Sequence, residues 1–143
     1  MLECWGDPSI YDVAISFSKN EREYVRDLAN FLKERNVLVF FDEFAQVDMW
    51  GQDGFEYLQN IYVEKSKWVI VCISEDYMER AWPTYERKQV LGREFLKKDS
   101  SILPLRFDDI EVPSLPPQYM HLDVRDLTPQ MVGAIVIDKI SNP

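Results

Sequence analysis

Short apolar segments alternate with longer amphipathic segments along this chain. The short ones are residues 11–17, 37–41, 67–74, 102–107 and 121–124. Most are rich in β-branched or aromatic residues and are bounded by polar ones, a pattern typical of buried strands. Residues 67–74 form the most apolar segment, so we expect this strand to lie in the centre of a sheet.

The first amphipathic segment carries signals for both ends of a helix. Asn20 and Glu23 have the spacing of a capping box, which predicts that the helix starts at Asn20. Asn36 is suited to end it, because Asn tolerates the left-handed backbone found just after a helix. The predicted buried stripe consists of Val25, Leu28, Ala29 and Leu32.

Further helices are expected at residues 55–64, at 75–98 with an interruption at Pro83, and after Thr128. Pro129 supports the last of these, because proline is favoured at the first helical position. The inward face of that helix is predicted to carry Met131, Ile135 and Ile140. An irregular surface loop is expected around Pro113, Pro116 and Pro117.

This alternation predicts an α/β fold in which a parallel sheet is covered by helices on both faces. Ligands of such sheets bind outside the carboxyl ends of the strands. Here those ends are residues 17–19, 42–44 and 74–76. We therefore expect the chemistry of this protein to lie there.

Length and charge narrow the class of protein. A chain of 143 residues suits one domain, so we expect residues 1–143 to form it, with a core at about 10–141. The 16 Lys and Arg residues against 25 Asp and Glu give a net charge of −9, which disfavours direct contact with nucleic acid. No apolar run approaches the ~20 residues of a membrane span, so we expect no membrane contact.

Cysteine and histidine usage points to a cytoplasmic protein without a metal site. Cys4 and Cys72 are too few for a disulfide framework and lack metal-ligand spacing. Residues 1–8 also lack the basic-then-apolar order of a secretory signal. Because His121 is the only histidine, Ser-His or Cys-His catalysis would depend on that residue alone.

Two common nucleotide-linked folds are disfavoured by the turn after the first strand. Residues 18–21 contain no glycine, which both a dinucleotide fingerprint and a phosphate-binding P-loop need for close backbone approach. A phosphoacceptor receiver domain shares the same alternation of elements. It also needs carboxylates at the end of the first strand, and residues 15–18 offer none.

A more informative pattern is Trp82 followed by Pro83 and Glu86. Proline favours the first position of a helix, so Glu86 is expected in the first helical turn. The positive end of the helix dipole stabilises an ionised carboxylate there. A structural interpretation competes, because glutamate is common in first turns and tryptophan is commonly part of a core.

In their order and spacing, these motifs resemble a Toll/interleukin-1 receptor (TIR) domain of the bacterial type over nearly the whole chain. Residues 12–17 (D-V-A-I-S-F) look like the family's D-V-F-I-S-Y box. Residues 39–42 look like its second strand, which the BB loop follows at about residues 43–54. Trp82 and Glu86 match the Trp-x-x-x-Glu pattern of TIR domains that consume NAD. The resemblance implies a flavodoxin-like sheet of five parallel strands in the order 2-1-3-4-5.

The same resemblance implies an NAD+ nucleosidase that cleaves the nicotinamide–ribose bond, with Glu86 as its catalytic residue. Nicotinamide in NAD+ is already a cationic leaving group, so a lone carboxylate suffices to stabilise the oxocarbenium-like transition state. NAD+ is then the substrate, and neither a cofactor nor a metal is required. The candidate substrate-binding residues are Phe17, Ser18, Lys19, Asp42, Phe44, Ser74 and Trp82.

Roles within this set differ. Phe17, Phe44 and Trp82 are candidates to pack on the flat rings of NAD+, with core packing as the competing interpretation. Lys19 is placed to offset phosphate charge. Two other functions stay open: a cyclase, in which a ribose hydroxyl attacks in place of water to give cyclic ADP-ribose, and a non-enzymatic TIR–TIR signalling scaffold.

The loop at residues 43–54 carries more apolar side chains than a free loop should show to water. We expect Val47, Met49 and Trp50 to form an assembly surface, while folding of the loop over the sheet end as a lid is the alternative. In related TIR domains this loop meets the next subunit, and such head-to-tail contacts produce filaments or rows. The resemblance further implies a sensor domain or partner subunit and a role in bacterial antiviral defence.

Overall fold

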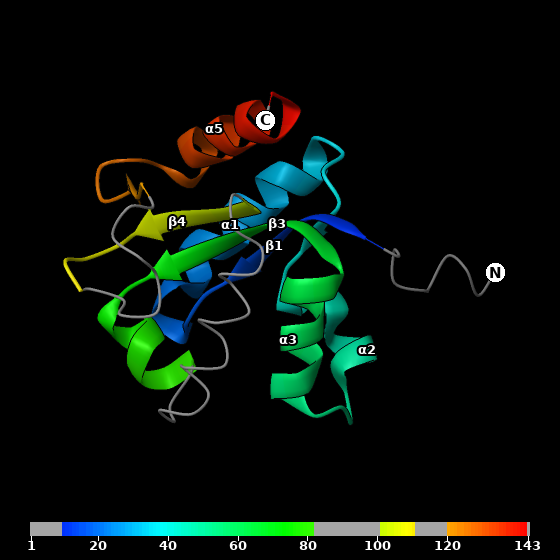
Figure 1. The fold of residues 1–143 in the computed structure, drawn as a ribbon. Helices are drawn as coiled ribbons and strands as arrows, with labels where there is room; N and C mark the ends of the chain where they lie inside the picture. Colours follow the sequence, from blue (N-terminus) through cyan, green and yellow to red (C-terminus); the bar gives the residue numbers. More distant parts are fainter. Residues whose placement is uncertain (1–9, 82–100, 111–119, 143) are drawn as a thin grey trace.

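Five parallel strands form one sheet in the computed structural model, which describes residues 10–81, 101–110 and 120–142 (Figure 1). The strands are β1 (Tyr11–Ser16), β2 (Val39–Phe40), β3 (Ser66–Ile73), β4 (Ile102–Arg106) and β5 (Leu122–Asp123). Their order is β2-β1-β3-β4-β5, and each neighbouring pair is parallel. The predicted flavodoxin-like fold and the central place of β3 are confirmed.

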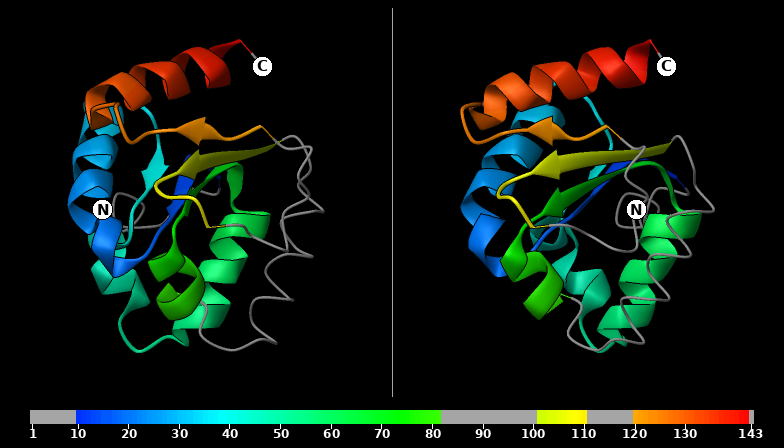
Figure 2. Two further views of the ribbon diagram at one scale, coloured as in Figure 1. Left: turned by 90° about the vertical axis from the view of Figure 1, so that its left-hand side faces the viewer. Right: turned by 60° about the vertical axis from the view of Figure 1, so that its left-hand side comes forward.

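Helices cover both faces of the sheet, as Figure 2 shows. On one face α1 (Arg22–Glu34) and α5 (Pro129–Ser141) pack against each other. On the other face lie α3 (Gly54–Glu64) and the short α2 (Gln46–Met49). The chain therefore has three layers, with the sheet in the middle.

Alternation along β3 supplies both apolar cores, because successive residues of a strand point to opposite faces. Ile70 and Cys72 join the core beneath α1 and α5. Val69, Val71 and Ile73 join the core beneath α3. All of these side chains are buried, as expected of the central strand of a sheet covered on both faces.

The start of α1 differs from the prediction, whereas its end agrees. A 3-10 turn, η2 (Lys19–Glu21), precedes α1, and neither element has a side-chain cap. The capping box at Asn20 is therefore wrong, and the backbone N–H of Asn20 donates instead to Asp76 Oδ2 at 3.3 Å. At the other end, Asn36 adopts the left-handed backbone with a φ of 66°, as predicted.

In α5 the predicted start is confirmed and the predicted inward face is wrong. Thr128 Oγ1 accepts a hydrogen bond from the Met131 N–H at 3.1 Å and caps the helix. Met131 and Ile135 are exposed, however, because the buried stripe runs one residue further along the helix. It consists of Val132, Gly133 and Val136. Ile140 is partly buried against the same core, as predicted.

Glycine at position 133 sets the rotation of α5. A Cβ built there overlaps the aromatic ring of Phe31 on α1, so the two helices meet ring against backbone. Turning the helix to bury Met131 and Ile135 would remove this contact. Tertiary packing thus decides the buried face of α5, which periodicity predicted wrongly at Met131 and Ile135.

The segment predicted as a loop at residues 43–54 contains regular structure. A 3-10 turn, η3 (Asp42–Ala45), leads directly into α2. After β3 the chain forms a π-helical turn, η4 (Tyr77–Ala81). The remainder of the helix predicted to Lys98 and the proline-rich segment at 111–119 lie outside the described residues. No helix within the described ranges has the length and apolar content needed to cross a membrane.

Replacing Gly133 with alanine is expected to destabilise the fold. The added methyl group meets the Phe31 ring, and overpacking of this kind costs about 1–3 kcal/mol in free energy of unfolding. Chemical denaturation followed by circular dichroism measures the effect. Gly54→Ala is the matched control, since an added Cβ there meets nothing within 4 Å. Equal midpoints for Gly133→Ala and the parent protein would contradict this account.

Candidate active site

Two concavities lie at the carboxyl edge of the sheet. The first, here called the Arg22 pocket, has a volume of about 910 Å³. Its lining residues are Arg22, Asp42, Glu43, Gln46, Val47, Met49, Trp50 and Gly51. The second, here called the acidic hollow, has a volume of about 630 Å³ and opens beside the ends of β1, β3 and β4. Both lie where a parallel sheet is expected to bind its ligand.

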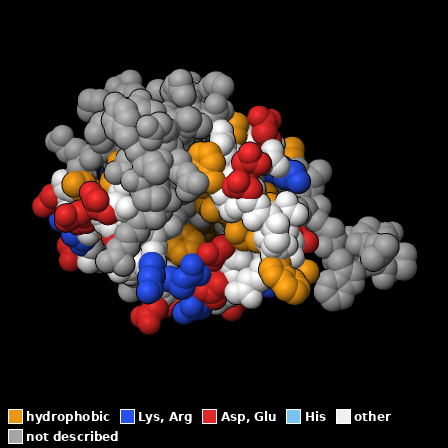
Figure 3. Space-filling model, turned by 90° about the horizontal axis from the view of Figure 1, so that it is seen from below, with side chains coloured by type: hydrophobic (Ala, Val, Ile, Leu, Met, Phe, Trp, Pro, Cys, Tyr) orange, Lys and Arg blue, Asp and Glu red, His pale blue; other side chains and the backbone are white. Residues whose placement is uncertain are grey.

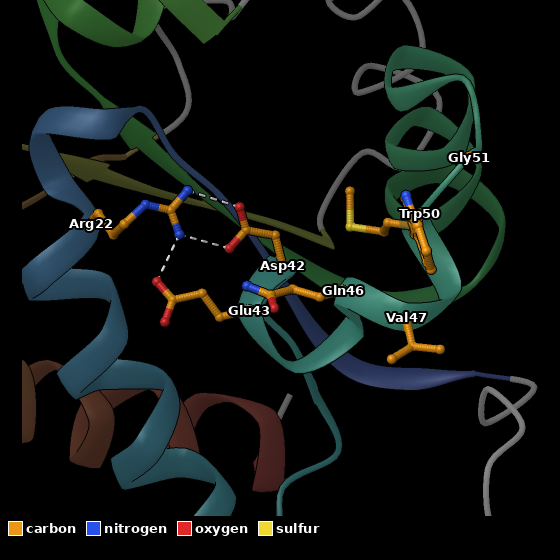
Figure 4. Close-up of a pocket in the computed structure, with 8 residues that line it drawn as sticks. Arg22, Asp42, Glu43, Gln46, Val47, Trp50 and Gly51 are labelled. Atoms are coloured by element: carbon orange, nitrogen blue, oxygen red, sulfur yellow. Dashed lines mark hydrogen bonds and ion pairs between the residues drawn. The ribbon is translucent and has the colours of Figure 1, made fainter.

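Ion pairs organise one wall of the Arg22 pocket (Figure 4). The two terminal nitrogens of Arg22 each donate to one oxygen of Asp42 at 2.9 Å, a bidentate arrangement. Arg22 Nη1 also donates to Glu43 Oε2 at 2.8 Å, and Arg26 binds both oxygens of Glu43. These bonds tie the first turns of α1 to η3. On the molecular face seen in Figure 3, basic and acidic side chains lie next to one another.

The same arginines keep Glu43 ionised. Hydrogen bonds from Arg26 and Arg22 lower the pKa of Glu43 to about 2. The bond to Asp42 in turn raises the pKa of Arg22 above its ordinary value. Glu43 and Arg22 therefore stay charged over the whole physiological pH range.

Aromatic rings lie against Arg22 of this cluster and against the neighbouring Lys33. Phe17 and Phe44 both pack on Phe41, with ring centroids 5.5 Å and 5.2 Å apart. The guanidinium of Arg22 lies 5.0 Å from the centre of the Phe17 ring, and the Lys33 amine lies 4.5 Å from that of Phe44. Cations over aromatic faces are held by the ring quadrupole, so both rings help to fix the charges above them.

A buried carboxylate forms the floor of the acidic hollow. Glu21 is only 7% exposed, and its Oε1 accepts hydrogen bonds from Ser18 Oγ at 2.6 Å and Ser74 Oγ at 2.7 Å. Burial raises the pKa of Glu21, and the nearby charge of Asp76 adds to the effect, while the two serine bonds oppose it. The carboxylate thus bridges the chain after β1 and the chain after β3.

Negative charge dominates this hollow. The acidic residues that line it are Glu21, Glu75, Asp76, Glu79 and Asp108. None of its described lining residues is Lys or Arg. It therefore repels a diphosphate and favours a cation. Within the described ranges, no group of three or more His, Cys, Asp or Glu residues is arranged to hold a metal ion.

The predicted substrate-binding residues fall into two groups. Phe17, Asp42 and Phe44 gather around Arg22 and its aromatic support. Ser18 and Ser74 meet at Glu21 on the other side of β1. Lys19 is exposed in η2, and Trp82 and the predicted catalytic Glu86 lie outside the described residues.

The predicted assembly residues are not equally exposed. Val47 and Trp50 are 83% and 88% exposed, which is unusual for large apolar side chains. Met49 instead packs against the core beneath α3, so it is a partly buried anchor of the segment. The structure therefore supports an apolar surface at two of the three positions.

The sequence patterns did not single out Glu21 and Arg22, the two side chains at the centre of the acidic hollow and of the Arg22 pocket. Ser18 and Glu21 have capping-box spacing themselves, a signal that could have singled out Glu21. The structure uses that spacing for a side-chain pair, since Ser18 donates to Glu21. No local signal identified Arg22, whose partners lie twenty residues along the chain.

Comparison with known sequences gives a consistent result. The sequence model of the TIR domain family matches residues 13–134. The chain is 35% identical over 130 residues to the 3' cyclic ADP-D-ribose synthase AaTIR of Aquimarina amphilecti, covering 91% of this chain and 40% of that protein. It is 32% identical over 96 residues to the NAD(+) hydrolase TirS of Staphylococcus aureus, covering 66% of this chain and 33% of that protein. The chain thus spans well under half the length of these relatives.

Solved structures agree on the fold. The TIR domain of the Toll-related receptor TRR-2 from Hydra magnipapillata superimposes with a TM-score of 0.65 at 22% identity, covering 92% of this chain and 99% of that one. A TIR-STING receptor from C. gigas gives a TM-score of 0.63 at 18% identity, covering 95% of this chain and 41% of that one. At such identities the likeness concerns the fold alone. Since the family match covers most of the sequence and the sheet has the same architecture, this chain belongs to the TIR domain family.

Proposed function

We propose that this chain cleaves NAD+ at the nicotinamide–ribose bond as the effector domain of a larger system. The observation that carries the proposal is the 35% identity to a cyclic ADP-ribose synthase over 91% of this chain. The similarity to an NAD+ hydrolase supports the same first step. The pair Trp82 and Glu86, at the spacing found in NAD-consuming relatives, supplies the residues for it.

The reaction asks little of the protein beyond charge and position. The bond between the ribose anomeric carbon and the nicotinamide nitrogen breaks, and nicotinamide leaves as a neutral molecule without protonation. Positive charge then spreads over the ribose, where an ionised Glu86 stabilises the oxocarbenium-like transition state. Attack by water completes the hydrolysis, giving ADP-ribose and one proton.

Of the two concavities, the Arg22 pocket suits NAD+ better. Its volume lies within the usual range for ligand sites, and Met49 in its lining offers apolar surface. Arg22 is the one cationic side chain among its described lining residues. Asp42 is the bidentate partner of Arg22. In this proposal its carboxylate oxygens also accept hydrogen bonds from the substrate.

The product of NAD+ cleavage is either ADP-ribose or cyclic ADP-ribose. One observation favours a cyclase as the alternative to a hydrolase. The relative with 35% identity is a cyclic ADP-ribose synthase. Cyclisation begins with the same bond cleavage but ends when a ribose hydroxyl of the substrate attacks in place of water. Chromatography of the products of NAD+ consumption separates ADP-ribose from its cyclic isomers and decides between the two.

Activity is proposed to depend on assembly. Val47 and Trp50 expose apolar surface beside the Arg22 pocket, next to the β2 edge of the sheet. At the opposite edge, an apolar groove of about 480 Å³ lies among β4, β5 and α5, and Ile135 in its lining is 45% exposed. The projecting side chains of Val47 and Trp50, here called the knob, can enter the groove of a second copy. Such a head-to-tail contact between copies forms rows instead of closed dimers.

The biological role is proposed from the resemblance to bacterial TIR domains rather than from the site. In this proposal the chain works with a sensor domain or a partner subunit in antiviral defence of a bacterium. A phage-challenge assay with the intact natural system, comparing the parent with Glu86→Gln, tests this role.

Glu86→Gln is expected to lower the rate of NAD+ cleavage by about 100-fold or more. The amide keeps the shape of the side chain but removes the charge that stabilises the transition state. The rate is measured by chromatography of nicotinamide release, and Glu64→Gln, an exposed site at the end of α3, is the matched control. Retained turnover in Glu86→Gln would mean that another residue stabilises the cation.

Trp50→Ala is expected to abolish the gain in specific activity that the parent shows as protein concentration rises. The substitution removes the exposed knob while leaving the core intact, so the thermal midpoint should not change. Leu38→Ala is the control, because Leu38 is 52% exposed and lies outside residues 43–54, which carry the proposed assembly surface.

Mixing variants sharpens this test. Ile135→Asp alters the groove and is expected to reproduce the Trp50→Ala defect. An equimolar mixture of the two contains one intact knob and one intact groove, so it should regain part of the activity. Specific activity that stays flat with concentration in the parent would instead favour the lid interpretation of the segment.

A further inference from the structure

Glu21 is an unusual residue in this fold because it is a carboxylate inside the protein. Among the described residues it is the only Asp or Glu that is buried. It lies at the junction of η2 and α1, beside the carboxyl end of β3. Burying a charge is costly unless its bonds compensate, so the contacts of Glu21 need an explanation.

Those contacts form a chain of hydrogen bonds that crosses from one strand end to the other. Ser18 and Ser74 both donate to Oε1 of Glu21. The Tyr77 backbone N–H donates to Ser74 Oγ at 3.0 Å. Further in, the Tyr77 hydroxyl and Ser16 Oγ lie 2.7 Å apart. The start of η4 is thus linked to the end of β1 in two ways: through the carboxylate of Glu21, and directly between the Tyr77 hydroxyl and Ser16.

The acceptor oxygen of Glu21 also decides how these groups are oriented. A serine hydroxyl has a single proton, and Ser74 donates it in a hydrogen bond to the carboxylate of Glu21. Its oxygen is then free to accept from the N–H of Tyr77, which begins η4. A further tie between the same two segments runs from the Asn20 N–H to Asp76 Oδ2.

On the basis of the proposed function, we propose that Glu21 is a positioning residue for NAD+ cleavage. It fixes the backbone from Ser74 to Tyr77, and the chain continues from Ala81 directly into the Trp82–Glu86 pattern. Turnover is sensitive to displacements of about 1 Å in the groups that meet the substrate. An anchor just ahead of the catalytic segment therefore controls kcat without touching NAD+.

This anchor has a cost in stability. Burial raises the pKa of Glu21, and the titratable groups around it do not relieve the penalty. Those facing it or lining the same hollow are Asp76, Glu75, Glu79, Asp108, Tyr24 and the Cys72 thiol. Arg22, the adjacent cation, is committed to Asp42 and Glu43 on the other side of β1. A charge kept in such a place fits a role in function better than one in stability.

Steady-state kinetics of five variants test the proposal. Glu21→Ala is expected to lower kcat by about tenfold or more with little change in KM. Ser74→Ala should cause a similar loss, and the double variant no greater loss, because both break one chain of bonds. Glu21→Gln should keep kcat within about threefold, since its amide oxygen accepts the same two bonds. Glu79→Ala, which removes an exposed charge from the same hollow, is the control.

The Glu21→Gln substitution should raise thermal stability at neutral pH, although it does not raise activity. A raised pKa in the folded state means that the parent loses stability as pH rises above the ordinary value of 4.5, whereas Gln does not titrate. The thermal midpoint of Glu21→Gln minus that of the parent should therefore grow between about pH 4 and about pH 7. A purely structural role would give the opposite result, with the parent more stable at neutral pH.

Three results would overturn the proposal: unchanged kcat in Glu21→Ala, a loss of kcat that Glu21→Gln does not restore, or a neutral-pH stability gain from the native carboxylate. Amide hydrogen exchange at Tyr77 separates this failure from failure of the proposed function. Exchange there should be faster in Glu21→Ala than in the parent and in Glu21→Gln. If the parent does not cleave NAD+, the proposed function fails, and exchange alone decides whether Glu21 is the anchor.

Discussion

Parallel pairing of β1 with β3 is the constraint on which the rest of this structure depends. Ser16 lies opposite Val71, so the chain leaves both strands at the same edge of the sheet. There the turn at residues 18–21 meets the turn at residues 74–77. Because β2 pairs with the other side of β1, the turn after β1 also faces the segment after β2. The acidic hollow lies between β1 and β3, where the strand order reverses, and the Arg22 pocket lies on the other side of β1, beside the segment after β2.

The adjacent residues Glu21 and Arg22, in the turn after β1, make contacts on opposite sides of that strand. Successive side chains of a helix point about 100° apart, so Glu21 and Arg22 diverge from one turn. Glu21 joins the serines on the β3 side, and Arg22 joins Asp42 and Glu43 on the β2 side. At the Arg22 pocket a cation is thereby paired with two carboxylates, while the acidic hollow has no Lys or Arg among its described lining residues.

Two local features oppose ordinary burial preferences. Glu21 is a charge inside the protein, and Trp50 is a large apolar side chain in water. Neither arrangement stabilises an isolated domain, and conflicts of this kind concentrate where a protein binds or reacts. Glu21 is compensated by two short hydrogen bonds. The exposed surface of Trp50 finds compensation only when another surface covers it.

By itself the sequence determined the parallel sheet, its central strand, and local signals such as the cap at Thr128 and the left-handed Asn36. Each depends on periodicity or on groups a few residues apart, which a sequence displays directly. The tertiary structure alone decided which face of α5 is buried, because the Phe31 ring requires Gly133 beneath it. It also decided that Glu21, rather than the side chain of Asn20, links to the end of β3. That choice depends on Ser74, which lies 53 residues away in the chain and reaches Glu21 only when β1 and β3 pair.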